Sequence, residues 1–360
     1  MYNEVRDNPE LLSLLTKDAA KVAGVWRPKA RWLGYAQRIN REIERAGLKD
    51  FRINYRLLKG FSQGGTPMPT LPQNFVKRAV WQTVERMPIM RTILAEERRL
   101  VKALHRKQVS EEIVLAQFVL SELEREGKNF IPPDGLAHGS AEDTFTDNER
   151  VMTALWVEHL ARAFDTYRLI SAKKVETIVE VGSGLVQTTL AHQTMNPHLK
   201  WVVNIDIPPV LYIAGQYLRS ISGVEVVDYS ETRDLKRIYP QEASDGRLRV
   251  YMLATWQTPR LEAKVDLFLN SASFQEMDRE TCLAYAKEIA RLVQKWAVLH
   301  CGRGGEKSKI DAGAVSADFV LDAFRQRFNT HDVHSGDWQK WYQQSGYATH
   351  IFTRKGIEQR

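Results

Sequence analysis

The chain has 360 residues, of which 43% are hydrophobic and 26% charged, and its net charge is +7. This composition excludes a disordered or fibrous chain and is sufficient for two domains with a sizeable core. The basic balance fits anionic partners such as acidic glycans, phosphates, a membrane surface or nucleic acid, and it selects none of them.

Few features point to a cell compartment. The only cysteines, Cys282 and Cys301, form neither a Cys-x-x-Cys pair nor a disulfide framework, which favours a reducing compartment. The N-terminus is polar and lacks the apolar core of a signal peptide. No apolar run approaches the roughly 18 residues that a membrane span needs. We therefore expect a cytoplasmic protein without a transmembrane segment, and peripheral contact with a membrane stays open.

Residues 1–146 are expected to form a mostly helical N-terminal domain. Asn8 suits the N-cap of a first helix and Pro9 its first turn. Further helices are predicted at 30–47, 75–87, 88–107 and 110–127. The Gly- and Pro-rich stretch 60–74 predicts a loop with the length of a lid or a substrate-facing segment. The domain boundary is placed in the connector 128–146, which contains Pro132 and Pro133.

Residues 147–360 are expected to form an α/β domain. Thr146 and Glu149 match a capping box, so a long helix is predicted from 147 to about 171. Helices are also predicted at 208–220, 279–295 and 315–328. Strands are predicted at 177–182, 201–206, 223–228, 248–254, 265–270, 296–301, 330–335 and 347–354. This alternation is typical of a doubly wound sheet, and the last strand is expected to be a hairpin partner at the sheet edge.

A glycine turn lies in the stretch Val175-Glu-Thr-Ile-Val-Glu-Val-Gly-Ser-Gly-Leu-Val-Gln187. Gly182 and Gly184, on either side of Ser183, permit a sharp turn and a close approach of a ligand to main-chain N–H groups. A strand, a glycine turn and a helix form the nucleotide-binding start of a doubly wound sheet. Gln187 replaces the Gly or Ala of the dinucleotide fingerprint, and the Gly-Lys-Ser/Thr of a phosphate-binding loop is absent.

Two acidic residues indicate which nucleotide to expect. Glu180 precedes the turn, where it would repel a pyrophosphate but suit a cationic sulfonium and a free amino group. Asp206 ends the next apolar run and is spaced to accept both ribose hydroxyls. We interpret the ligand as S-adenosylmethionine. The alternative is a parallel-strand turn with no ligand.

Polar residues also follow a later strand, in Asn270-Ser-Ala-Ser-Phe-Gln-Glu-Met277. Ligands bind at the carboxyl ends of such strands, so Ser271 and Ser273 are candidates to donate to the methionine moiety or the substrate. Glu276 is a candidate general base, and its alternative role is to cap a helix N-terminus. His300, at the end of the following strand, is a second candidate base, although a single histidine more often has a structural role.

Three further features concern the acceptor and metals. Arg303, in Gly302-Arg-Gly-Gly, suits a carboxylate or phosphate of the substrate unless it lies in a surface turn. Trp338 belongs to an aromatic group at 338–347 that fits a sugar-stacking site or a core. Zinc patterns are missing, so no metal site is predicted, although Mg²⁺ bound by scattered carboxylates stays open.

Three segments together resemble a family of bacterial sugar O-methyltransferases: Val179-Glu-Val-Gly-Ser-Gly, Asn204-Ile-Asp-Ile-Pro and Asp266-Leu-Phe-Leu-Asn-Ser-Ala-Ser-Phe-Gln-Glu-Met277. Members of that family are class I S-adenosylmethionine-dependent enzymes, often associated with surface polysaccharide loci. The resemblance covers about residues 150–355, and Ser-Phe-x-Glu-Met is its most specific part. Leu185-Val186-Gln187 departs from the Tyr-Gly-Gly-like residues common at that position.

The resemblance implies a Rossmann-like class I methyltransferase fold with S-adenosylmethionine as cofactor. It implies that Ile207 and Ala254 flank adenine and that 270–276 faces the reacting centre. The full donor site that it implies consists of Glu180, Gly182, Ser183, Gly184, Asp206, Ile207, Ala254, Asn270 and Ser271.

We therefore expect a methyltransferase that acts on a sugar hydroxyl of a bacterial surface glycan or its precursor, with an acceptor whose anionic character stays open. The N-terminal helices are expected to form the acceptor site or a homodimer contact. A phenolic or natural-product hydroxyl is the nearest alternative acceptor. A nucleic-acid substrate is disfavoured, because 270–273 read Asn-Ser-Ala-Ser and not Asn/Asp-Pro-Pro-Tyr/Phe. A non-catalytic assembly partner is the remaining alternative.

Overall fold

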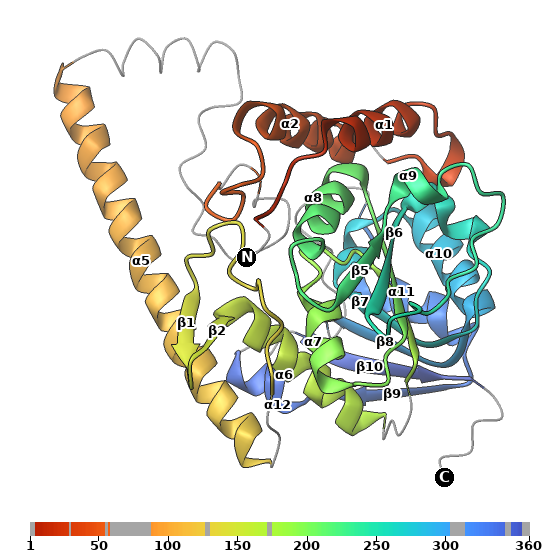
Figure 1. Ribbon diagram of the computed structural model, residues 1–360. Coiled ribbons are helices and arrows are strands. Elements are labelled where there is room, and N and C mark those ends of the chain that lie inside the picture. The colour runs from red at the N-terminus through yellow and green to blue at the C-terminus, as the bar shows by residue number, and fades with distance from the viewer. Residues whose placement is uncertain are drawn as a thin grey trace.

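The computed structural model describes residues 4–28, 30–54, 57, 88–126, 130–170, 175–302, 314–342 and 347–354. Its centre is an eight-stranded sheet in the order β5-β6-β4-β3-β7-β8-β10-β9 (Figure 1). The strands are β3 (Thr177–Val181), β4 (Trp201–Asp206), β5 (Val224–Val227), β6 (Leu248–Ala254), β7 (Val265–Ser271), β8 (Val293–Gly302), β9 (Thr330–His334) and β10 (Tyr347–Thr353). The strands from β5 to β8 pair in parallel, whereas β10 is antiparallel to both neighbours.

The strand order turns around at β3. On one side the chain proceeds from β3 to β4, then to the edge strand β5 and back to β6 between them, and it continues with β7 and β8 on the other side. In an open α/β sheet this reversal leaves a crevice at the carboxyl ends of the central strands, where ligands bind. A mostly parallel sheet whose strand order reverses at its centre is a doubly wound α/β sheet, so the predicted fold class is confirmed.

Helices cover both faces of the sheet. Neighbouring residues on a strand point to opposite faces, so Ile178 joins one apolar core and Val179 the other. The helices α6 (Ala154–Leu169), α7 (Gln187–Met195) and α8 (Pro208–Leu218) pack on the first face, and α10 (Arg279–Leu292) and α11 (Ala317–Arg325) on the second. Burial on both faces explains why the parallel strands are continuous apolar runs.

Two N-terminal helices lie side by side at one end of the molecule, next to α8 (Figure 1). These are α1 (Pro9–Ala19) and α2 (Ala30–Ala46). The predicted N-cap is confirmed, because the Asn8 side chain accepts a hydrogen bond from the Leu11 N–H at 3.1 Å. Between the two helices, a short 3₁₀ turn (Gly24–Trp26) reaches α10.

The helices predicted at 88–107 and 110–127 are one continuous helix, α5 (Pro88–Arg125), so their separation was wrong. The residues between them include neither Pro nor Gly. The Ser110 hydroxyl donates to the Arg106 carbonyl at 2.9 Å, which is compatible with an unbroken helix. The predicted helix at 75–87 and loop at 60–74 lie outside the described residues.

A β-hairpin replaces the start of the helix predicted from 147. It pairs β1 (Thr144–Asp147) with β2 (Arg150–Thr153) through Asn148 and Glu149, which both have positive φ. Two such residues form the type I′ turn whose twist matches a hairpin. The helix α6 starts later, after Thr153, which caps the Trp156 N–H. The capping-box pattern at 146–149 was therefore a false signal.

The last strand is not at the sheet edge as predicted. β10 lies between β8 and β9, and β9 is the edge strand. Ala348, Ile351 and Phe352 of β10 are buried, whereas Val333 of β9 is exposed. The remaining elements are α9 (Tyr229–Thr232), α12 (Asp337–Trp341), and the 3₁₀ turns η2 (Thr255–Arg260) and η3 (Ser273–Glu276). None of the described helices is both long and apolar enough to cross a bilayer.

Candidate active site

The glycine turn lies between β3 and α7 and requires glycine at its first position. Gly182 has a φ of 75°, and a Cβ there would lie 2.3 Å from the Ser273 hydroxyl. Its N–H donates to the Ile205 carbonyl at 2.9 Å, which joins the turn to β4. Gly184 also has a positive φ, and its N–H donates to the Asp206 carboxylate at 3.2 Å. The Ser183 hydroxyl is buried and has no partner among the described residues.

Asp206 lies at the carboxyl end of β4, directly across from this turn. Its carboxylate accepts the Ile207 N–H at 2.7 Å as well as that of Gly184. Burial raises the pKa of Asp206 to about 7, the two backbone hydrogen bonds oppose this, and the charge of Glu276 adds to it. Ile207 follows as the N-cap of α8, and the buried Ala254 pairs in register with Asp206. Both neighbours therefore lie beside the Asp206 carboxylate.

Glu180 is a nearly fully buried carboxylate in β3, two residues before Gly182. Burial raises its pKa to about 8, although the Thr188 hydroxyl and the charge of Arg162 act in the opposite direction. Its Oε2 atom has no hydrogen-bond partner in the part of the chain that the structure describes. A buried polar atom without a partner is costly, so this carboxylate suits a ligand that brings a donor or a positive charge.

Asn270 and Ser273 both contact the strand that carries the glycine turn. The Asn270 amide donates to the Val181 carbonyl at 2.8 Å and to the Ser273 hydroxyl at 2.5 Å. That hydroxyl in turn donates to the Val181 carbonyl at 3.1 Å. The two side chains therefore fix the end of β3, and the predicted substrate contact of Ser273 stays a prediction.

The two candidate bases differ in their surroundings. Glu276 ends η3 and is half-buried, and its charge acts on Asp206, which places it near the carboxyl end of β4. His300 is buried in β8, where its Nδ1 lies 3.1 Å from the Thr349 hydroxyl. Burial, with the positive charge of Arg162, holds the pKa of His300 well below its usual range. A neutral imidazole of such low basicity is a poor general base near pH 7.

Ser271 and Trp338 are brought together by an arginine. Arg162 of α6 donates to the Ser271 hydroxyl at 3.0 Å, and its guanidinium lies 4.3 Å from the centre of the Trp338 ring. Trp338 is buried beneath this guanidinium and meets His300 edge to face. Arg303 lies outside the described residues. No group of three or more described His, Cys, Asp or Glu residues has the arrangement of a metal site.

Three site residues were missed from the sequence. Tyr35 of α2 has a buried hydroxyl without a described partner, and burial together with the charges of Asp206 and Glu276 raises its pKa. His159 and Arg162 lie on α6, and His159 Nδ1 is 2.9 Å from the Thr188 hydroxyl. For His159 and Arg162, the only signal in the sequence was their position on the helix that precedes β3. No local pattern indicates Tyr35.

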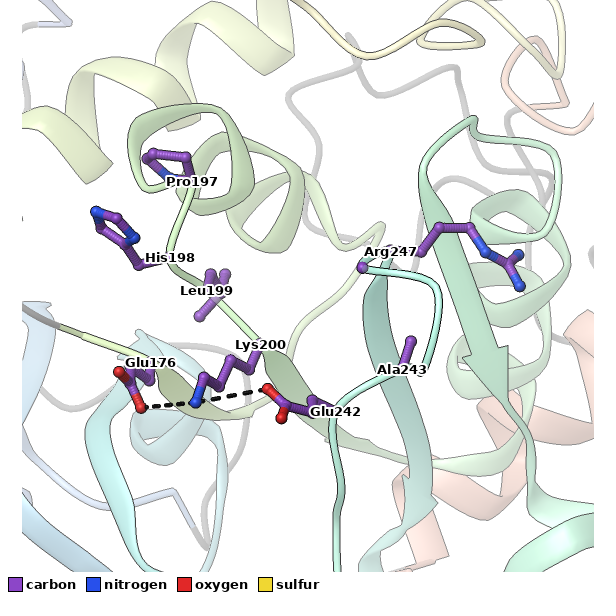
Figure 2. A pocket seen from close by; sticks show the side chains of 9 residues that line it. Glu176, Pro197, His198, Leu199, Lys200, Glu242, Ala243 and Arg247 are labelled. Atoms are coloured by element: carbon purple, nitrogen blue, oxygen red, sulfur yellow. Dashed lines mark ion pairs between the residues drawn. The ribbon is translucent and has the colours of Figure 1, made fainter.

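A separate pocket of about 430 Å³ lies at the other end of the strands, where β3 and β4 begin (Figure 2). Lys200 lies at its floor and forms ion pairs with Glu176 at 3.2 Å and Glu242 at 3.5 Å. The lysine is therefore engaged by two carboxylates, and the pocket is far from the glycine turn along the strands. It is therefore not part of the candidate site.

Comparisons with known proteins found no matching family model and no matching curated protein. Among solved structures, the chain is similar to a candidate O-methyltransferase from Nostoc punctiforme, with a TM-score of 0.38 and 10% identity over 56% of this chain and 58% of that one. It is similar to PigF with SAH at a TM-score of 0.38 and 15% identity, over 54% and 55% of the two chains. Human N-acetylserotonin methyltransferase in complex with SAM matches at a TM-score of 0.35 and 9% identity, over 56% and 53%. The match thus spans less than three fifths of each of these proteins.

Proposed function

We propose that the protein is an S-adenosylmethionine-dependent O-methyltransferase. The observation that carries the proposal is the pair of carboxylates around the glycine turn: Glu180, which is buried and has an oxygen without a described partner, and the half-buried Asp206. A pyrophosphate offers neither carboxylate a hydrogen-bond donor or a positive charge. The adenosyl ribose offers two hydroxyls to Asp206, and the amino group of the methionine part offers a cation to Glu180.

The donor, when bound, supplies an activated methyl group on a sulfonium. The residues of the chain bind and orient it: Gly184 borders open space that the donor can enter, Gly182 leaves room for Ser273, and Asn270 and Ser273 fix the turn. Methyl transfer is an in-line displacement, so much of the catalysis comes from positioning. Glu276 accepts the proton of the acceptor hydroxyl, because its charge lies beside the donor site while His300 is only weakly basic.

The acceptor is a small-molecule hydroxyl. A sugar hydroxyl is supported by the resemblance of the stretch 273–277, Ser-Phe-Gln-Glu-Met, to sugar O-methyltransferases. A phenolic or natural-product hydroxyl makes the same chemical demands on Glu276 and the donor site. An acceptor screen that contains sugars, acidic sugars and phenols therefore distinguishes the two classes of acceptor.

Calorimetric titration with S-adenosylhomocysteine tests the donor site. We expect micromolar binding by the wild-type protein and a loss of about tenfold or more in Asp206→Ala, because the ribose hydroxyls lose their acceptor. Asp245→Ala is the matched control, since this carboxylate lies on a loop and pairs with Arg247. Absence of binding by the wild type would contradict the proposal and leave a non-catalytic partner as the alternative.

A further inference from the structure

The guanidinium of Arg162 occupies a buried position next to the reacting centre. Its Nη1 donates to the Ser271 hydroxyl at 3.0 Å and its Nη2 to the Glu158 carboxylate at 2.9 Å. The side chain is only 12% exposed. Ser271 ends β7 and pairs in register with His300 of β8. Arg162 therefore lies over the carboxyl ends of these two strands.

Several hydrogen-bond donors around Arg162 are unmatched. The Nε of Arg162, the Nε1 of Trp338 and the hydroxyl of Tyr342 are buried and have no partner in the described part of the chain. The first two can only donate, and a tyrosine hydroxyl donates as well. The charge of Arg162 acts on Tyr342, so the two side chains are close. Buried donors without an acceptor are rare in folded proteins. Three of them close together indicate a ligand that brings hydrogen-bond acceptors.

This cluster is on the far side of the donor site. Asp206 and Glu180 lie on β4 and β3, whereas Ser271 and His300 lie on β7 and β8. Adjacent strands are about 5 Å apart, so the cluster begins one strand beyond the carboxylate that suits the methionine part. A molecule that receives the methyl group has to approach from that side, because the adenosine half occupies the other.

We propose that Arg162 is the centre of an anion-binding subsite for the methyl acceptor, which takes a carboxylate or phosphate group of that molecule. This inference rests on the proposed function. A guanidinium binds such groups through two parallel N–H bonds, and a buried position strengthens the interaction. Glu158 pairs with Nη2, and the Nε–H is the donor of this guanidinium without a described partner. The subsite would select acidic acceptors over neutral ones of the same shape.

Two pairs of probes test the subsite by NMR titration of the protein saturated with S-adenosylhomocysteine. Glucuronate is compared with glucuronamide, and para-hydroxybenzoate with para-hydroxybenzamide, since each pair keeps its shape and differs in charge. We expect the wild type to prefer the anion of at least one pair by about tenfold. Arg162→Gln should abolish this preference, and Arg162→Lys should keep part of it, because an ammonium retains the charge but loses the fork.

Arg168→Gln is the matched control, because this arginine lies on the same helix and pairs with Asp165 and Asp337. Circular dichroism establishes whether each variant is folded. If Arg162→Gln does not fold, Arg162→Lys serves as the test variant. A wild type without charge preference, or a preference that persists in Arg162→Gln, would overturn the inference.

The donor also contains a carboxylate, which decarboxylated S-adenosylmethionine lacks. If Arg162→Gln weakens binding of S-adenosylmethionine but not of this analogue, Arg162 serves the donor and the inference is overturned. A wild type that binds no donor at all contradicts the proposed function separately, because the charge preference can still be measured without donor.

Discussion

Glu180 is a carboxyl group that the fold keeps out of water and leaves half satisfied. Its pKa of about 8 means that it is mostly protonated at neutral pH when no ligand is present. A ligand ammonium group favours the ionised form, so donor binding and proton release are coupled. The same carboxyl therefore affects both the stability of the free protein and the pH dependence of binding.

The pH dependence follows from the sign of this shift. The unfolded chain loses the Glu180 proton near its ordinary value of 4.5, whereas the folded chain keeps it until about pH 8. Between these values the folded state holds more protons, so the contribution of Glu180 to stability falls as pH rises. Binding of S-adenosylhomocysteine should strengthen across the same range and release a proton. Glu180→Gln should reduce both effects, and the dependence that is left is that of Asp206, whose pKa burial raises to about 7.

Thermal melts and calorimetry from about pH 5 to about pH 9, in buffers of different ionisation enthalpy, measure these changes. Glu176→Gln is the control, because this glutamate lies at the opposite edge of the sheet and pairs with Lys200. An unchanged pH slope in Glu180→Gln would contradict the assignment.

Glu180 and Asp206 could be predicted because each lies at the end of a β-branched run, and the two runs are neighbouring strands whose carboxyl ends lie together. The glycine turn was equally local. Tyr35 and Arg162 could not be predicted as site residues, because their positions depend on how α2 and α6 pack against strands far along the chain. The hydrogen bond from Arg162 to Ser271 spans 109 residues. No pattern within a window of sequence contains such a contact.

At the scale of elements, the strands and their boundaries agree closely with prediction, whereas the region from 88 to 153 does not. Strand runs are specified by apolar side chains that both faces bury. The hairpin β1–β2 depends on a turn, and Asn148-Glu149 lacks the glycine that normally marks it. Thr146 and Glu149 matched a helix start only by their spacing. A hairpin forms there instead, in which Phe145 pairs with Met152.

Glu149 offers a test of this turn. Its φ of 66° is unfavourable for a residue with a Cβ, and its side chain is exposed. Glu149→Gly should therefore stabilise the protein by about 1 kcal/mol in chemical denaturation, since Asn-Gly is the preferred type I′ pair. Glu149→Val should destabilise it. Equal stabilities of the two variants would show that the turn has another conformation.

At the scale of the whole molecule, the N-terminal segment crosses the sheet at the carboxyl ends of its parallel strands. Asp18 of α1 accepts hydrogen bonds from Arg233 at 2.8 Å and from the Tyr229 hydroxyl at 3.0 Å. The Thr255 and Thr281 hydroxyls donate to the carbonyls of Trp26 and Val25. With Tyr35 near Asp206, these contacts place the first helices over the carboxyl end of β4.

Removing Arg233 should loosen this cover. In Arg233→Ala, amide hydrogen exchange in residues 9–19 is expected to speed up several-fold, because Asp18 loses the cationic partner that ties it to the rest of the molecule and keeps only Lys21 of its own segment, while the sheet core is unaffected. Arg247→Ala is the control, since it removes an arginine from the exposed pair with Asp245. Mass spectrometry of peptides from α1 and β3 measures the change. Equal exchange of α1 in wild type and variant would show that apolar packing on α8 holds it alone.

This cover also has a consequence for biosynthesis. The Asn8 N–H bonds the Tyr212 hydroxyl, and the Thr281 hydroxyl bonds the Val25 carbonyl, over separations of 204 and 256 residues. At ribosomal rates of roughly 5–20 residues per second, α1 leaves the ribosome about 10–40 s before its docking surface exists. During that time Leu11, Leu12 and Leu15 have no native surface to cover them. The first helices are therefore among the last to dock, and the nascent chain carries an exposed apolar segment that chaperones can bind.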